Sequence, residues 1–232
     1  MSKAEIALDR WFQSPPGQAL LQLEAEVLAK LIASKWGDHC VQIGGPASKL
    51  LRCASPIIHH ILLKQTDCVA EEASLVINHY DELALMPNSV DLIIVPHGVE
   101  LVHDPKHFFK EIYQALKPEG LLVMLCFNPS GIGSLWRLQA IRQHFPRLRW
   151  RSTYGLLEDL QSVGFSQLRR YSVGFQPGLG QEELRSCWGL DKAIAWFCPL
   201  AGAVSIVTAR KEETGFLLNR EKSPAFAWGE VS

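Results

Sequence analysis

Hydrophobic positions along the chain follow two alternating spacings. Over residues 18–34, leucine, valine and isoleucine recur every three or four positions, which predicts an amphipathic helix. Short apolar runs follow, and several are apolar at consecutive positions, as is typical of parallel strands covered on both faces. We expect strands at 39–44, 57–63, 74–77, 90–95 and 120–127.

Helical segments lie between and after these strands. The clearest covers 105–116, with Asp104 as its N-cap and Pro105 at its first helical position. Further helices and strands are expected at 134–143, 153–163, 166–173, 181–196 and 203–209. Strands that alternate with helices predict an α/β fold with a doubly wound, mostly parallel sheet.

The pattern predicts one domain over 1–212, with an N-terminal helical extension (1–36) and a C-terminal tail (213–232). Trp11 and Phe12 are expected to pack back on this domain. The uncharged run at 193–209 is interrupted by a proline and a glycine. We therefore interpret its second half as a buried strand and expect no membrane span.

Composition indicates a cytoplasmic protein with no general affinity for nucleic acid. The formal net charge is -1, so binding to a polyanion would need a local patch. None of the six cysteines shows C-x-x-C spacing, which favours buried free thiols in a reducing compartment. The first residues carry charges where a signal peptide would be apolar.

Ligands of an open parallel sheet bind beyond the carboxyl ends of its strands. Gly44, Gly45 and Pro46 directly follow the first predicted strand, and the two glycines would let the backbone approach a ligand. The three spaced glycines of a dinucleotide-binding oxidoreductase are missing, which argues against that class. A simple turn between strand and helix is an equal interpretation of this pair.

The second half of the sheet carries a more specific pattern. Residues 83–94 (LALMPNSVDLII) resemble the LPF…SFD passage of class I S-adenosylmethionine (SAM) methyltransferases. Residues 96–105 (PHGVELVHDP) are similar to the loop after strand four of that family, and 111–120 (EIYQALKPEG) to its helix and turn into strand five. With Phe127-Asn128-Pro129, the chain resembles a little-characterised, type 11-like bacterial branch whose first glycine motif is degenerate.

This resemblance implies a seven-stranded sheet whose last strand is antiparallel, SAM as methyl donor, and S-adenosylhomocysteine as product. It also implies which residues contact the cofactor. His97, at the mouth of the fourth strand, is the best-placed candidate for lining the site, and a role in capping the loop is an equal interpretation. The expected cofactor-binding residues are Gly44, Gly45, His79, Tyr80, Pro96 and His97. Methyl transfer from a sulfonium needs mainly alignment, so the sequence identifies no catalytic residue. His103 and His107 lack the acidic partner of a zinc motif, and we expect no metal.

Three positions depart from the family pattern. Gln42 stands at the acidic residue of the first motif. Leu63-Lys64-Gln65 lies where an acidic residue normally binds the ribose, with Asp67 as a nearby substitute. His79 replaces the aspartate that accepts a hydrogen bond from the adenine. Each lost charged acceptor costs roughly 1.5–3 kcal/mol. A catalytically inactive binding or scaffolding protein of the same fold is therefore the alternative.

A basic segment follows the fifth predicted strand. Residues 136–151 contain no acidic side chain, and aromatic residues lie between the arginines. Its arginines are Arg137, Arg142, Arg147, Arg149 and Arg151. This segment fits an acidic small-molecule acceptor or RNA as partner, or else a solvated face balanced by acids elsewhere. The methyl acceptor and the oligomeric state are not predicted.

Overall fold

A seven-stranded sheet forms the centre of the computed structural model, which describes residues 3–46, 55–65, 74–77, 79–129, 148–173 and 202–212. The strand order is β3-β2-β1-β4-β5-β7-β6. The strands are β1 (His39–Ile43), β2 (His59–Lys64), β3 (Ser74–Ile77), β4 (Val90–Pro96), β5 (Leu116–Phe127), β6 (Phe165–Val173) and β7 (Val204–Lys211). Neighbours from β3 to β5 pair in parallel, while β7 runs antiparallel to both β5 and β6. The predicted fold class is confirmed.

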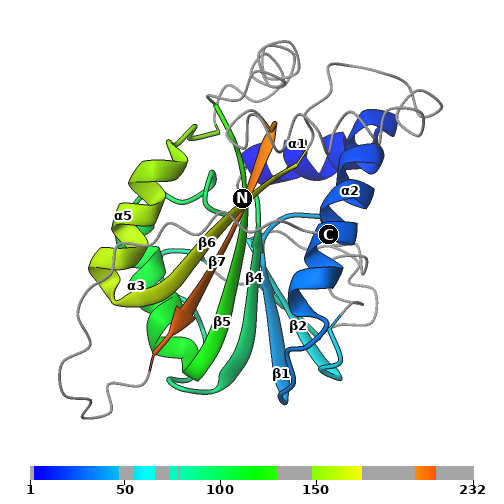
Figure 1. Cartoon of the computed structure of the whole chain (residues 1–232). Helices are drawn as coiled ribbons and strands as arrows, with labels where there is room; N and C mark the ends of the chain where they lie inside the picture. Colours follow the sequence, from blue (N-terminus) through cyan, green and yellow to red (C-terminus); the bar gives the residue numbers. More distant parts are fainter. Residues whose placement is uncertain are drawn as a thin grey trace.

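Helices cover both faces of the sheet. They are α1 (Lys3–Phe12), α2 (Pro15–Ile32), α3 (Pro105–Ala115) and α5 (Thr153–Val163). α3 and α5 lie on one face and α2 on the other, while α1 lies across the upper ends of the strands (Figure 1). Within the described residues, none of the helices has the length and apolar character that a membrane span requires.

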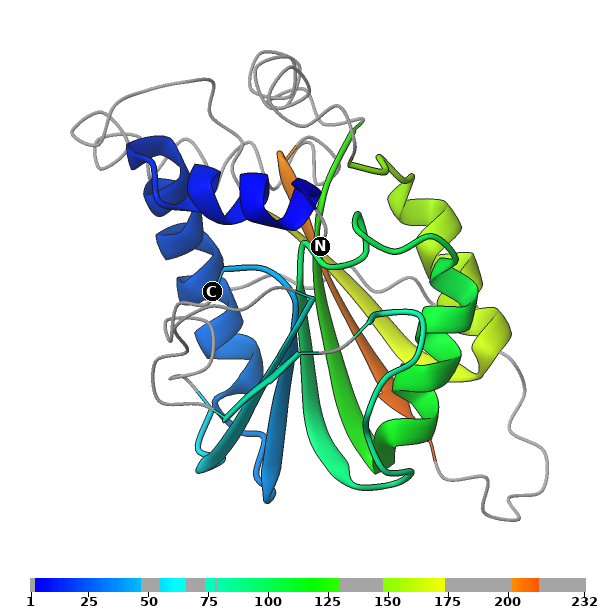
Figure 2. The ribbon, with the colours of Figure 1, turned by 180° about the vertical axis from the view of Figure 1, so that it is seen from behind.

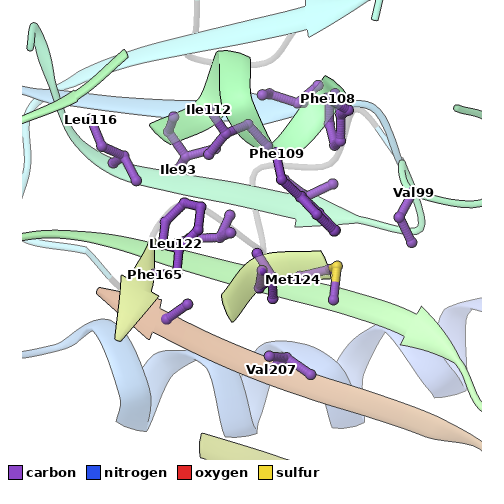
Figure 3. Packing of buried hydrophobic residues seen from close by; sticks show 14 of the residues in the cluster. Ile93, Val99, Phe108, Phe109, Ile112, Leu116, Leu122, Met124, Phe165 and Val207 are labelled. Carbon is purple, nitrogen blue, oxygen red and sulfur yellow. The ribbon is translucent and has the colours of Figure 1, made fainter. Parts of the chain in front are cut away.

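The two faces bury separate hydrophobic clusters. Under α3 and α5, Phe108, Phe109 and Ile112 pack against strand residues such as Ile93 and Met124 (Figure 3). The opposite cluster lies under α1 and α2 and includes their residues Leu8, Phe12, Leu20, Leu21, Leu28 and Ile32. The expectation that Phe12 packs back on the domain is confirmed, since the side chain is 1% exposed.

Two elements begin three or more residues away from the sequence expectation. α2 begins at Pro15 rather than at residue 18, because Ser14 is extended and the prolines occupy the first helical turn, where no backbone donor is needed. β5 begins at Leu116 rather than 120, because Leu116 is already extended and its side chain is fully buried. Asp104 caps α3 as expected, accepting hydrogen bonds from the amides of Lys106 and His107.

Several predictions fall on residues outside the described ranges. These are the helices at 134–143 and 181–196, the tail 213–232, Asp67, and Arg137, Arg142 and Arg147 of the basic segment. The second half of the uncharged run does form a strand, since residues 204–209 of β7 are buried. Cys40 and Cys126 are buried free thiols, as expected.

Candidate functional site at the carboxyl edge of the sheet

The turn after β1 packs directly on the end of β4. Gly44 and Gly45 have φ values of 70° and 69°, which favour glycine. A Cβ atom on Gly45 would lie 2.4 Å from the carbonyl oxygen of Pro96, and one on Gly98 would lie 2.8 Å from that of Ile43. The glycines therefore allow a close approach between two loops of the protein itself.

The side chain of Gln42 is hydrogen-bonded to the turn after β1. Its fully buried side-chain amide donates hydrogen bonds to the carbonyl oxygens of Gly44 (3.0 Å) and Pro46 (2.8 Å). The resembled family has an acidic side chain at this position, which could accept but not donate these bonds. The glutamine at this position therefore stabilises the turn through its side-chain amide, which an acidic residue could not do in the same way.

Lys64, at the end of β2, is fully buried and binds the N-terminal helix. Its Nζ atom lies 2.6 Å from Oδ2 of Asp9 and 4.0 Å from Oε1 of Glu5, both on α1. The same ammonium donates a hydrogen bond to the carbonyl oxygen of Gly45 at 2.9 Å. Burial raises the pKa of Asp9, and the charge of Lys64 opposes that shift. A cation and two carboxylates from α1 therefore occupy the position where ribose recognition was expected.

Tyr80 joins the same network. Its hydroxyl donates a hydrogen bond to Glu5, and the ring is 1% exposed. Burial, followed by the charge of Glu5, raises the pKa of Tyr80 well above its ordinary value. A Cβ atom on Gly44 would lie 3.0 Å from the Tyr80 hydroxyl oxygen, so the ring lies against the glycine turn. The neighbouring side chain of His79 is exposed.

His97 lies at the mouth of β4 between two carboxylates. Its Nε2 atom is 2.9 Å from Oε1 of Glu24 on α2, and its Nδ1 atom is 3.7 Å from Oε1 of Glu100. The ring is fully buried, with its centroid 5.2 Å from that of Phe12 and 4.1 Å from that of Phe127. Burial lowers the pKa of His97, but the two negative charges outweigh it and raise the pKa to about 9.

The backbone at His97 is also unusual. Its φ is 52°, in the left-handed region that few non-glycine residues adopt. The strain is held by neighbouring contacts, including a hydrogen bond from the His97 amide to the carbonyl oxygen of Leu125 at 2.8 Å. Glu100 fixes the other side of the loop, because its Oε1 accepts a hydrogen bond from the amide of Phe127 at 2.7 Å. Backbone strain of this kind often marks functional positions.

The predicted cofactor residues thus gather at one edge, but α1 and α2 cover most of them. Gly44, Gly45, Tyr80, Pro96 and His97 are buried, and His79 alone of the six is exposed. Sequence reasoning missed the acidic partners Glu5, Asp9 and Glu24 on the two N-terminal helices. Their signal was present, since acids at positions 5 and 9 share one helical face with the buried Phe12.

Two described arginines of the basic segment bind the loop before α3. Nη2 of Arg151 donates to the carbonyl oxygens of His103 (2.8 Å) and Val102 (3.3 Å). The amide of Arg149 donates to the carbonyl oxygen of Glu100 at 3.0 Å. These contacts give the end of the segment a structural role beside the candidate site.

A possible set of metal ligands lies at the opposite, amino edge of the sheet. Among the described residues, Asp38, His39 and Asp91 bring ligand atoms within 4.8 Å of one another. The ammonium of Lys117 already lies 2.9 Å from a carboxylate oxygen of each aspartate. This group is therefore a structural ion cluster that joins β1, β4 and β5.

Comparisons with known proteins agree with this fold. A family model described as a methyltransferase domain matches residues 58–124, which run from the start of β2 into β5. No curated protein matches the chain. The family match and the fold together confirm the resemblance to class I SAM-dependent methyltransferases.

Solved structures share the fold at low sequence identity. The partner of the Trm112 methyltransferase activator from Haloferax volcanii has a TM-score of 0.67 at 17% identity, covering 92% of this chain and 99% of that one. A SAM-dependent methyltransferase from Thermotoga maritima has a TM-score of 0.65 at 16% identity, covering 90% and 100%. The [4+2]-cyclase SpnF has a TM-score of 0.61 at 18% identity, covering 86% and 83%. At these identities the structural similarity establishes the fold but not the activity.

Proposed function

We propose that this protein is a SAM-dependent methyltransferase that binds SAM at the carboxyl edge of β1, β2 and β4 and releases S-adenosylhomocysteine. The observation that carries the proposal is the methyltransferase-domain match over 58–124, which includes the Pro96–His97 end of β4. The strained backbone of His97 at that end supports a functional role for the loop. The cofactor contacts proposed are Gly44, Gly45, His79, Tyr80, Pro96 and His97.

The groups at this edge suit a cofactor that carries a positive sulfonium and ribose hydroxyls. Lys64 cannot accept a hydrogen bond from a ribose. However, three carboxylate oxygens nearby are buried without a hydrogen-bond partner: Asp9 Oδ1, Glu24 Oε2 and Glu100 Oε2. The oxygens of Glu24 and Glu100 would hold hydroxyl or amino groups of SAM, which supplies the methyl group. The protein's own part is to bind, orient and exclude water.

The acceptor is proposed to be an acidic small molecule or RNA that binds through the basic segment 137–151. Arg149 and Arg151 support the loop between β4 and α3. A cytoplasmic location and a single domain over 1–212 are part of the same proposal.

A non-catalytic binding protein is the second candidate, and one specific observation favours it. Lys64, Tyr80 and His97 are each 0–1% exposed, and carboxylates of α1 and α2 contact all three. Of these three side chains, Lys64 and Tyr80 direct their polar groups at the protein itself, whereas Nδ1 of His97 is buried without a hydrogen-bond partner.

Isothermal titration of the purified protein with SAM and with S-adenosylhomocysteine tests the choice. The methyltransferase proposal expects binding of both at micromolar strength, followed by transfer of labelled methyl to an acceptor fraction. Adenosine monophosphate is the matched control, because it carries the adenosine but lacks the sulfonium and amino-acid group. Absence of SAM binding up to millimolar concentration would favour the non-catalytic candidate.

A further inference from the structure

α1 presents an acidic face to the candidate cofactor edge. The helix has ten residues, and Glu5, Asp9 and Phe12 lie on one side of it. Glu5 is fully buried, Phe12 is 1% exposed, and the Asp9 side chain is 23% exposed. Seen from behind, α1 lies across the upper ends of the strands (Figure 2). Buried carboxylates on a short terminal helix need a compensating partner.

Lys64 and Tyr80, at the carboxyl edge of the sheet, are these partners. Lys64 binds Asp9 at 2.6 Å and also binds Gly45, while the Tyr80 hydroxyl binds Glu5. These are the ends of β2, β1 and the loop after β3, where the strand topology places a nucleotide-like ligand. The carboxylates of α1 therefore compete for the same atoms that such a ligand would use.

α1 is attached by two buried apolar side chains, Leu8 and Phe12, and by its contacts with Lys64 and Tyr80. The Lys64–Asp9 ion pair holds α1 at the edge through Oδ2 of Asp9. The other carboxylate oxygen, Oδ1, is buried without a hydrogen-bond partner, which costs free energy in the docked state. Gln13 and Ser14 alone separate α1 from α2, so a movement of α1 would have to be taken up at these two residues. A ten-residue helix is marginal on its own in water, so α1 depends on this docking.

We propose that α1 is an internal strap: Glu5 and Asp9 occupy the cofactor edge through Lys64 and Tyr80, and SAM binds only when α1 leaves that edge. This inference rests on the proposed function. If only molecules with α1 undocked bind SAM, the apparent dissociation constant equals the intrinsic dissociation constant divided by the undocked fraction. Undocking returns Lys64 and both carboxylates to water, so no charge stays buried without a partner.

The double variant Glu5→Gln and Asp9→Asn tests the strap. Both changes keep the size of the side chains and one acceptor oxygen on each, but they remove the charges and leave Lys64 without a counter-ion in the docked state. The matched control is Glu26→Gln with Glu158→Gln, which removes two exposed charges from α2 and α5. Each protein is titrated with SAM, and hydrogen exchange of the amides in 3–12 is followed with and without SAM.

The strap predicts that the double variant binds SAM about tenfold more tightly or better than the wild type and the control. Exchange in 3–12 should rise in the variant without ligand, and in the wild type when SAM is added. The single variant Glu5→Gln, which removes one carboxylate, should show a smaller change in the same direction and is available if the double variant does not fold.

Two results overturn the strap while leaving the proposed function intact. One is SAM binding to the wild type with unchanged exchange in 3–12. The other is weaker SAM binding by the double variant, which would show that the carboxylates hold the cofactor instead of excluding it. If the variant exchanges freely in 3–12 and still binds no SAM, the proposed function fails together with the strap.

Discussion

The buried imidazolium of His97 should make the stability of the protein depend on pH. The pKa of this group is raised from 6.5 to about 9 in the folded protein, against burial, by the charges of Glu24 and Glu100. One pKa unit corresponds to 1.36 kcal/mol, so the shift stabilises the fold by roughly 3 kcal/mol when His97 is protonated in both states.

The sign of the effect follows from proton counting. Between about pH 6.5 and 9 the folded protein keeps the proton on His97 while the unfolded chain releases it. The stabilisation is therefore complete below pH 6.5, falls as the pH rises, and is lost above about pH 9. Urea unfolding at several pH values across this window measures the free energy of unfolding directly.

Two variants isolate the contribution of His97. In Glu24→Gln, one of the two negative charges is gone, so the loss of stability with pH should be smaller and should be complete at lower pH. In His97→Gln, the titrating group is absent, and that part of the pH dependence should vanish. If His97→Gln loses as much stability between pH 6.5 and 9 as the wild type, the imidazolium is not its cause and the reasoning is refuted.

Further substitutions test the packing of the edge, each by the free energy of unfolding in urea. Lys64→Met should lower the free energy of unfolding by about 3–5 kcal/mol, because it leaves buried carboxylates without a counter-ion. Lys30→Met, on the exposed side of α2, should change it by less than about 0.5 kcal/mol. Equal losses in the two variants would contradict a buried ion pair at Lys64. Gly45→Ala should destabilise by at least about 1 kcal/mol, because φ is positive and Pro96 blocks the Cβ atom. By contrast, Gly155→Ala in α5 meets no atom within 4 Å and should stabilise by roughly 0.5–1 kcal/mol. Asp104→Ala should cost about 1 kcal/mol by removing the cap of α3, and no loss would mean that the cap is not needed.

The sheet could be predicted from sequence because its signal is local. Apolar runs such as 90–95 and 120–127 form strands that are buried on both faces, and Asp104-Pro105 marks a helix start that the structure reproduces. The two element starts that shifted most lie at or near prolines. Pro15 and Pro118 mark breaks in the pattern, but the sequence alone does not decide whether the element begins before or after such a residue.

The predicted site residues lie at one edge because the carboxyl ends of parallel strands meet there. Their surroundings could not be predicted, because the partners come from far away in the chain. Lys64 and Asp9 are 55 positions apart, Tyr80 and Glu5 are 75 apart, and His97 and Glu24 are 73 apart. Glu5 and Asp9 share a helical face with Phe12, but the sequence does not show which groups pack against that face. Only the docking of α1 and α2 buries these acids.

A crystal structure of the protein grown with saturating S-adenosylhomocysteine would test the central claim most directly. We predict the ligand beyond the carboxyl ends of β1 and β4, in contact with Gly44, Gly45 and Pro96, with α1 displaced from Lys64. A structure in which the edge holds no ligand and Asp9 still binds Lys64 would refute both proposals.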